Sequence, residues 1–168
     1  LFPGAKEVGV EFNSLSKTYG LAGARIGFCV GNPEVVKHLK LLKSNMDYGM
    51  FLPLQKAAIA AITGDQSCVE TTRAAYEKRR DVLCDGLSAI GWKFPKPEAT
   101  MFVWAPIPGS FTSSEVFAVE LVKRSGVLVT PGSAFGPSGE GYVRMALVQD
   151  EPELKQGIAA IDACGILK

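Results

Sequence analysis

The residues from Ser14 to Gly27 combine a single lysine with hydroxyl groups, glycines and an arginine. Ser14 and Ser16 precede Lys17, and Arg25 follows a glycine-rich stretch. A lysine amine becomes nucleophilic near neutral pH when it is desolvated or placed near other positive charge. Hydroxyls, backbone N–H groups and an arginine fork bind phosphate well, and glycines let the backbone approach a ligand. The run therefore predicts a Schiff-base lysine beside a phosphate-binding site.

The residues on either side of this run have the patterns of β-strands. Residues 8–12 alternate apolar and other side chains, and residues 26–30 form a continuous apolar run. A lysine beside serines is also common on solvated surface loops. A polar, glycine-rich loop between two buried strands is instead where α/β enzymes build their sites. The two expected strands favour the second interpretation.

The run from Ser14 to Gly27 resembles the lysine signature of the class I and II aminotransferases, which depend on pyridoxal 5'-phosphate. This resemblance implies that Lys17 forms the Schiff base with the cofactor. It also implies that Ser14 and Arg25 bind the cofactor phosphate and that Ser16 helps at the same site. Residues 11–14 and 47–51 look closest to the branch that contains LL-diaminopimelate and alanine aminotransferases.

Arg144 stands in an otherwise apolar stretch, residues 141–147. An arginine is rarely buried without a partner, and an edge-strand arginine with its head in solvent is the simple alternative. Residues 131–136 and 141–144 together resemble the aminotransferase segment whose arginine holds the substrate α-carboxylate. A bidentate pair of this kind would orient the amino acid so that its Cα–H faces Lys17.

The resemblance covers essentially all 168 residues, but they match only the C-terminal part of such an enzyme. We therefore expect a fragment of a longer chain with an α/β fold. Residues 1–64 would be the end of the large, mixed-sheet cofactor-binding domain, residues 65–91 a long linking helix, and residues 92–168 a small α+β domain. The family's groups around the cofactor ring would lie outside this chain, which alone should bind cofactor poorly and turn over little.

Local signals predict the elements in more detail. Asn32 and Pro33 mark a helix start, and residues 54–62 form an alanine-rich helix that looks buried. Thr112 with Glu115 and Asp150 with Glu153 have the spacing of capping boxes. The expected strands of the small domain, one of which carries Phe102 and Trp104 as core residues, cover residues 100–105, 127–129 and 142–148. Helices should cover one face of this sheet.

Composition excludes several classes of function. Apolar residues make up 47% and charged residues 21%, and the net charge is +1, so nothing indicates a nucleic-acid or anionic-membrane partner. No stretch has the length of a transmembrane helix. A single histidine makes a His-based triad or metal site implausible. The four cysteines lack C-x-x-C spacing and are expected to be buried free thiols, typical of a reducing, cytoplasmic compartment.

The resulting hypothesis is an enzyme that transfers an amino group between an amino acid and a 2-oxo acid with pyridoxal 5'-phosphate. By family resemblance the full enzyme would be a homodimer, and residues 46–49 would approach substrate. Two alternatives stay open. One is a C–S lyase or related lyase that shares the lysine signature. The other is a non-catalytic remnant that uses the anion site to bind a phosphate ligand or a partner.

Overall fold

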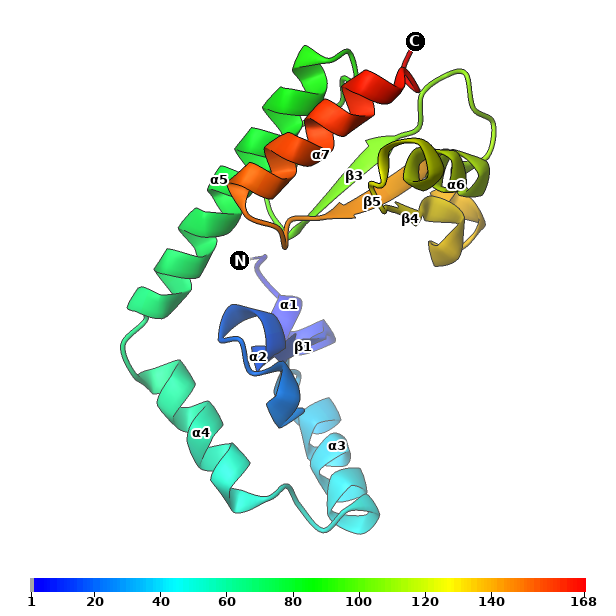
Figure 1. Cartoon of the computed structure of the whole chain (residues 1–168). Coiled ribbons are helices and arrows are strands. Elements are labelled where there is room, and N and C mark those ends of the chain that lie inside the picture. Colours follow the sequence, from blue (N-terminus) through cyan, green and yellow to red (C-terminus); the bar gives the residue numbers. More distant parts are fainter. Residues whose placement is uncertain (1) are drawn as a thin grey trace. The chain divides into compact units, whose positions relative to one another are not determined.

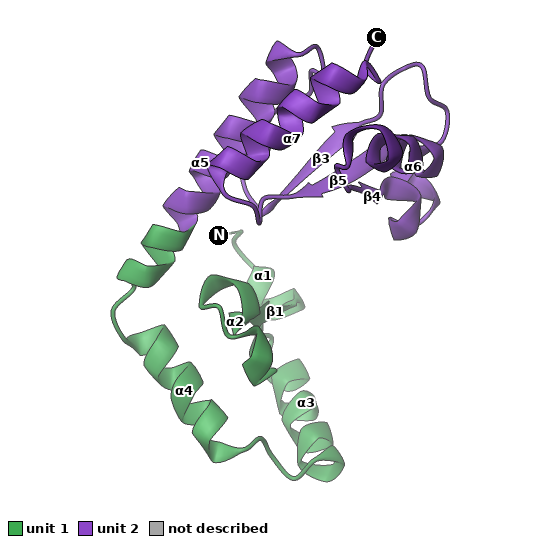
Figure 2. Ribbon diagram, in the orientation of Figure 1, with its two compact units in different colours: residues 1–72 green, residues 73–168 purple. Residues whose placement is uncertain are grey.

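The structure, a computed structural model, describes residues 2–168 and divides the chain into two compact units. One unit ends at Thr72 and the other runs from Arg73 to Lys168 (Figure 2). Both mix helices with a small sheet, which confirms the α/β class. The assignment of residues 1–64, 65–91 and 92–168 to a large domain, a linking helix and a small domain stays a prediction.

The first unit is built around one β-hairpin (Figure 1). Its elements are α1 (Ala5–Val8), β1 (Val10–Ser14), α2 (Leu15–Thr18), the 3-10 turn η1 (Ala22–Ala24), β2 (Gly27–Gly31), α3 (Pro33–Met46), α4 (Leu52–Thr63) and the beginning of α5 (Ser67–Ala89). The first strand begins at Val10, because the residues before it form α1 rather than strand. Helix α3 starts as predicted, with the Asn32 side chain accepting hydrogen bonds from the N–H groups of Glu34 and Val35.

The core of the first unit is small. Its buried residues are Leu15, Ile26 and Ala58. The prediction of two buried strands and a buried helix over residues 54–62 is therefore wrong for the described chain: Phe12 of β1 is 71% exposed, and Ala58 is the only buried residue in α4. A two-stranded sheet offers too little surface to bury both of its own faces.

One glycine of the lysine run is required by the strands rather than by a ligand. β1 and β2 pair antiparallel with Ser14 opposite Gly27. A Cβ at Gly27 would lie 2.5 Å from the carbonyl oxygen of Asn13. The close approach of the two strands therefore explains this glycine without any cofactor.

The second unit is a three-stranded antiparallel sheet with helices. From Arg73 onward it contains the rest of α5, β3 (Phe102–Pro106), α6 (Ser114–Ser125), β4 (Thr130–Pro131), the 3-10 turns η2 (Gly132–Phe135) and η3 (Pro137–Gly139), β5 (Tyr142–Ala146) and α7 (Glu151–Cys164). The strand order is β3-β5-β4. The prediction of a strand over residues 127–129 is wrong, because pairing with β5 begins only at Thr130.

Helices cover one face of this sheet, as predicted from the order of the elements. Val103, Ala105, Val143 and Met145 point into a core shared with α5, α6 and α7. Helices α5 and α7 run side by side (Figure 1), and a Cβ at Gly86 would lie 2.5 Å from the Cδ1 atom of Ile158. This core holds most of the buried residues in the described chain.

The two predicted capping boxes have different outcomes. At the start of α7, Asp150 and Glu153 form the reciprocal capping box that was predicted. At the start of α6 the cap is Ser113, whose side chain accepts the N–H of Val116, so Thr112 was the wrong choice. Adjacent Thr and Ser residues are both good caps, and the local pattern alone did not distinguish them.

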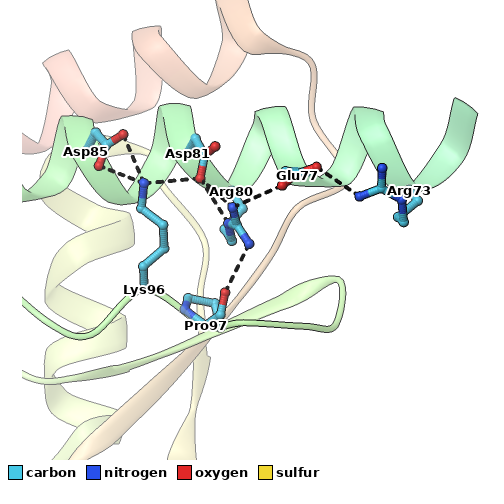
Figure 3. Close-up of polar contacts among 7 residues, drawn as sticks. All are labelled: Arg73, Glu77, Arg80, Asp81, Asp85, Lys96 and Pro97. Atoms are coloured by element: carbon cyan, nitrogen blue, oxygen red, sulfur yellow. Dashed lines mark hydrogen bonds and ion pairs between the residues drawn. The ribbon is translucent and has the colours of Figure 1, made fainter. Parts of the chain in front are cut away.

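A polar network fixes the segment before β3 on helix α5 (Figure 3). Lys96 forms ion pairs with Asp81 at 3.1 Å and with Asp85 at 3.0 Å. Arg80 donates to Asp81 and to the carbonyl of Pro97. Arg79 pairs with Asp150 at the start of α7. Arg79 and Arg80 therefore both have structural roles, in ion pairs with Asp150 and Asp81.

This network should make the stability of the second unit depend on pH. Hydrogen bonds from Arg80 and then Lys96 hold the pKa of Asp81 below its ordinary value, so its contribution is lost as pH falls through that lowered pKa. Hydrogen bonds to Asp85 and Asp81 raise the pKa of Lys96, so its contribution is lost as pH rises through that raised pKa. Lys96→Met should lower the melting temperature at neutral pH. It should also make the melting temperature change less with pH in both the acid and the alkaline range.

Thermal unfolding followed by circular dichroism across acid, neutral and alkaline buffers measures this effect. Lys93→Met is the matched control, since Lys93 lies in the same segment and forms no ion pair with any described residue. Identical pH profiles for Lys96→Met and the native chain would contradict the assignment.

Candidate cofactor and substrate sites

The hairpin of the first unit brings the predicted cofactor residues together. Beyond the last strand pair, Ser14 with Gly27, the N–H of Leu15 donates to the carbonyl of Ile26 at 3.3 Å. Ser16 and Arg25 are the next residues on the two arms of the hairpin. The loop therefore brings Ser14 and Arg25, which are eleven residues apart in the sequence, to neighbouring positions.

Ser14 begins the single turn that carries the lysine. Its Oγ accepts the N–H of Ser16 at 3.1 Å and donates to the Oγ of Ser16 at 2.9 Å. Leu15 is buried and anchors this turn, whereas Lys17 is exposed. The turn therefore holds its backbone by an apolar anchor and presents the amine of Lys17 outward.

Arg25 has an unusual backbone conformation. Its φ of 53° lies in the left-handed region, which costs a non-glycine residue about 1 kcal/mol or more. Its guanidinium donates to the carbonyl of Ala22 at 3.1 Å, and buried Ile26 follows it directly. Strained residues of this kind persist where the surrounding structure fixes them, and they cluster at functional sites.

The chemistry of this loop fits a phosphorylated cofactor. It offers two hydroxyls, one amine and a guanidinium with five N–H donors, one of which, on Nη1, already donates to the carbonyl of Ala22. Among residues 2–168, neither Lys17 nor Arg25 forms an ion pair with a carboxylate. Two uncompensated positive charges beside hydroxyl groups suit a phosphate dianion, and the amine of Lys17 suits its aldehyde.

Arg144 lies on the outer face of the sheet in the second unit. It occupies the central strand β5, opposite Trp104 of β3 and Thr130 of β4. Its side chain is half-buried, and its Cζ atom lies 4.4 Å from the ring centroid of Phe102 and 4.5 Å from that of Phe135. The simple alternative, a guanidinium extended into solvent, does not describe this packed arrangement.

The prediction that Phe102 and Trp104 are core residues is wrong. Trp104 is 40% exposed, because Val103 and Ala105 occupy the inner face and alternate positions must point outward. The Trp104 ring stacks on the Tyr142 ring and contacts the Phe135 ring edge-to-face, with 5.6 Å between the ring centroids in each pair. We call Phe102, Trp104, Phe135 and Tyr142 the outer aromatic group. The matched alternation of residues 102–106 and 142–146 was the sequence signal that could have revealed it.

The cofactor residues and Arg144 belong to different units. Ser14, Ser16, Lys17 and Arg25 lie in the unit that ends at Thr72, and Arg144 lies in the unit that begins at Arg73.

Other candidate groups have simpler surroundings. No group of three or more His, Cys, Asp or Glu residues among residues 2–168 is arranged to hold a metal ion. His38 is exposed on α3, with its ring against the carbonyl of Glu34. Cys84 is buried, and this burial raises the pKa of its thiol, but Cys68 is exposed, so the prediction of four buried thiols is wrong. No described helix is long and apolar enough to span a bilayer.

Comparison with known proteins identifies the class. The profile described as aminotransferase class I and II matches residues 4–161. The chain belongs to this family, as the lysine signature predicted, and the family's enzymes depend on pyridoxal 5'-phosphate.

Individual relatives agree with the predicted branch. An LL-diaminopimelate aminotransferase from Moorella thermoacetica is 44% identical over 156 residues, which are 93% of this chain and 40% of the relative. The glutamate-pyruvate aminotransferase AlaC from Escherichia coli is 48% identical over 163 residues, 96% of this chain and 40% of the relative. The chain thus spans about 40% of the length of these relatives.

Solved structures share the fold at similar coverage. Apo-BacF from Bacillus subtilis superposes with a TM-score of 0.89 at 36% identity, covering 96% of this chain and 41% of that one. An aminotransferase from Staphylococcus aureus gives a TM-score of 0.91 at 32% identity, covering 99% and 44% of the two chains.

The backbone strain at Arg25 leads to a test. Arg25→Gly removes the left-handed penalty but also raises the entropy of the unfolded chain, so stability should stay level or rise by up to about 1 kcal/mol. The same change removes one of the proposed phosphate donors and should weaken phosphate binding. Thermal unfolding and phosphate titration, each compared with Arg25→Lys, measure the two effects. A large loss of stability in Arg25→Gly would show that the arginine is structural instead.

Proposed function

We propose that the chain contributes the cofactor-anchoring lysine and the carboxylate-binding arginine of an enzyme that transfers an amino group between an amino acid and a 2-oxo acid. The observation that supports this most directly is the hairpin loop itself. It gathers Ser14, Ser16, Lys17 and Arg25 on one short, anchored turn, with no carboxylate paired to either cation among the described residues.

Each residue of the loop has a distinct task in this proposal. When bound, pyridoxal 5'-phosphate supplies an electron sink that stabilises negative charge at the substrate Cα. The Nζ of Lys17 would hold the cofactor covalently and, when free, would move a proton from the substrate Cα to the cofactor carbon that carried the aldehyde. Ser14 and Arg25 would hold the phosphate. The Ser14 hydroxyl, which donates to Ser16 at 2.9 Å here, would donate to the phosphate instead and accept from Ser16.

Arg144 holds the substrate carboxylate. A guanidinium binds a carboxylate through two parallel N–H···O bonds, which fix both its position and its plane. A carboxylate held in this way has a single orientation, which also sets the direction of the adjoining Cα–H bond. Loss of this fork would affect substrate binding more than the attachment of the cofactor.

The substrates and assembly are also part of the proposal. The relatives are named for LL-diaminopimelate and for glutamate with pyruvate, so we expect an amino acid and 2-oxo acid from this range. A homodimer is typical of the family, and exposed apolar side chains such as Phe12 and Ile59 in the first unit support burial against further protein. A cytoplasmic location completes the proposal, supported by the four free cysteines.

Covalent trapping tests the role of Lys17. Because the chain alone is expected to bind the cofactor weakly, it is incubated with a large excess of pyridoxal 5'-phosphate. It is then reduced with borohydride, which makes even a weakly populated Schiff base permanent, digested and analysed by mass spectrometry. We expect the pyridoxyl phosphate mass to concentrate on the peptide that contains Lys17 and to disappear from it in Lys17→Ala. Addition of inorganic phosphate should protect Lys17, since both ligands need the same donors.

The control for this trapping is Lys37→Ala, which removes an exposed lysine of α3 that pairs only with Glu34 in the described chain. It should leave the Lys17 adduct unchanged. Labelling spread evenly over the exposed lysines, with no protection by phosphate, would refute the cofactor site. It would also leave the non-catalytic alternative without its anion site.

A further inference from the structure

Arg144 differs from the other five arginines of the sequence in what it contacts. Arg25, Arg79, Arg80 and Arg124 each donate to a backbone or carboxylate oxygen, and Arg73 pairs with Glu77. Among residues 2–168, Arg144 has no hydrogen bond or ion pair with an oxygen acceptor, and its recorded partners are two aromatic rings. A half-buried guanidinium without an acceptor carries a desolvation cost that a carboxylate would offset.

We propose that Phe102 and Phe135 are positioning residues that hold the Arg144 guanidinium by its flat surface and leave its N–H edge free for the substrate carboxylate. This inference rests on the proposed function, since it names how the carboxylate-binding arginine of that function is oriented. It assigns a task to two residues outside the lysine loop, and both come from elements of the second unit.

The geometry supports contact of the rings with the flat surface of the guanidinium and binding of the carboxylate at its N–H edge. Its Cζ atom lies 4.4 Å and 4.5 Å from the two ring centroids, well within the range of a cation–π contact. An arginine stacks on an aromatic ring through its flat surface, whereas it donates hydrogen bonds from its edge. The two kinds of contact therefore do not compete. The apolar rings also exclude water from one side, which strengthens the attraction between the guanidinium and a carboxylate.

The sheet fixes one of the two rings. Phe102 pairs with Ala146 in the register of β3 and β5, and Trp104 pairs with Arg144. Phe102 is therefore the diagonal neighbour of Arg144 on the same face, a distance that an aromatic side chain can bridge.

A tight loop fixes the other ring. Phe135 ends the 3-10 turn η2, which follows β4 directly. Gly132 and Gly139 approach so closely that a Cβ on either would collide with the carbonyl oxygen of the other. The Glu140 carboxylate accepts the N–H groups of Gly141 at 2.8 Å and Ser114 at 2.6 Å, which lowers its pKa and ties the loop to the start of α6. Phe135 is thus held by backbone packing rather than by contact with Arg144 alone.

Nuclear magnetic resonance of the ¹⁵N-labelled chain tests this inference without cofactor or turnover. The Nε–H signal of Arg144 is assigned by its disappearance in Arg144→Lys, and the chain is titrated with propionate, or with propanamide as the uncharged probe. We expect a saturable shift with propionate only. Phe102→Leu and Phe135→Leu keep apolar volume but remove the ring, and each should weaken propionate binding about three- to fivefold.

Two control variants and one spectroscopic readout separate positioning from folding. Tyr142→Leu removes a ring of the same outer aromatic group that has no recorded contact with Arg144, and it should leave propionate affinity unchanged. Phe135→Tyr restores the ring and should bind like the native chain. Nearby rings displace the Arg144 Nε–H signal upfield. This displacement should shrink in Phe102→Leu and Phe135→Leu and persist in the two control variants.

Native propionate affinity in both folded Leu variants would overturn the inference, as would the lack of any saturable propionate shift in the native chain. These outcomes are independent of the covalent trapping at Lys17. A failed trapping experiment with intact propionate binding would refute the cofactor site alone. Absence of propionate binding would also remove the carboxylate role of Arg144 from the proposed function, whereas native affinity in Phe102→Leu and Phe135→Leu would refute the positioning role alone.

Discussion

The alternation of side chains along β5 determines what the second unit presents on its surface. Val143 and Met145 are buried against the helices, so Arg144 between them must point to the opposite face. A slip of one residue would drive the guanidinium into an apolar core and expose two core side chains, at a cost of several kcal/mol. The hydrophobic packing of the sheet therefore fixes the position of the arginine before any ligand is considered.

The same arrangement recurs on a smaller scale in the first unit. Leu15 and Ile26 are buried and joined by a backbone hydrogen bond, and they separate exposed Lys17 and Arg25 from the strands. Lys17 lies two residues beyond one anchor, and Arg25 directly precedes the other. In both units a buried apolar neighbour fixes a charged side chain, so packing and site geometry are specified together.

The sequence predicted those features that depend on near neighbours in the chain. The lysine signature, the Asn32 cap and the Asp150–Glu153 capping box are all patterns within a few residues, and the family and the two caps are confirmed. The roles of Ser14, Ser16, Lys17, Arg25 and Arg144 themselves stay predictions.

The errors concern features that depend on distant elements. Which face of residues 102–106 is buried depends on three helices, so Phe102 and Trp104 were placed in the core. The prediction of a strand over residues 127–129 was wrong for a related reason, since strand pairing depends on which residues lie beside β5. Phe135 could not be assigned from its own segment, because its contact with Arg144 requires the approach of Gly132 and Gly139.

The two tryptophans of the chain have opposite environments within the second unit. Trp92 is buried, with its indole N–H donating to the carbonyl of Pro106 and its ring against Phe117, whereas Trp104 lies on the outer face beside Phe135. Their fluorescence therefore reports on two different things. The shorter-wavelength emission of Trp92 follows the integrity of the core, and the quencher-accessible emission of Trp104 follows whatever comes to rest on the face that carries Arg144.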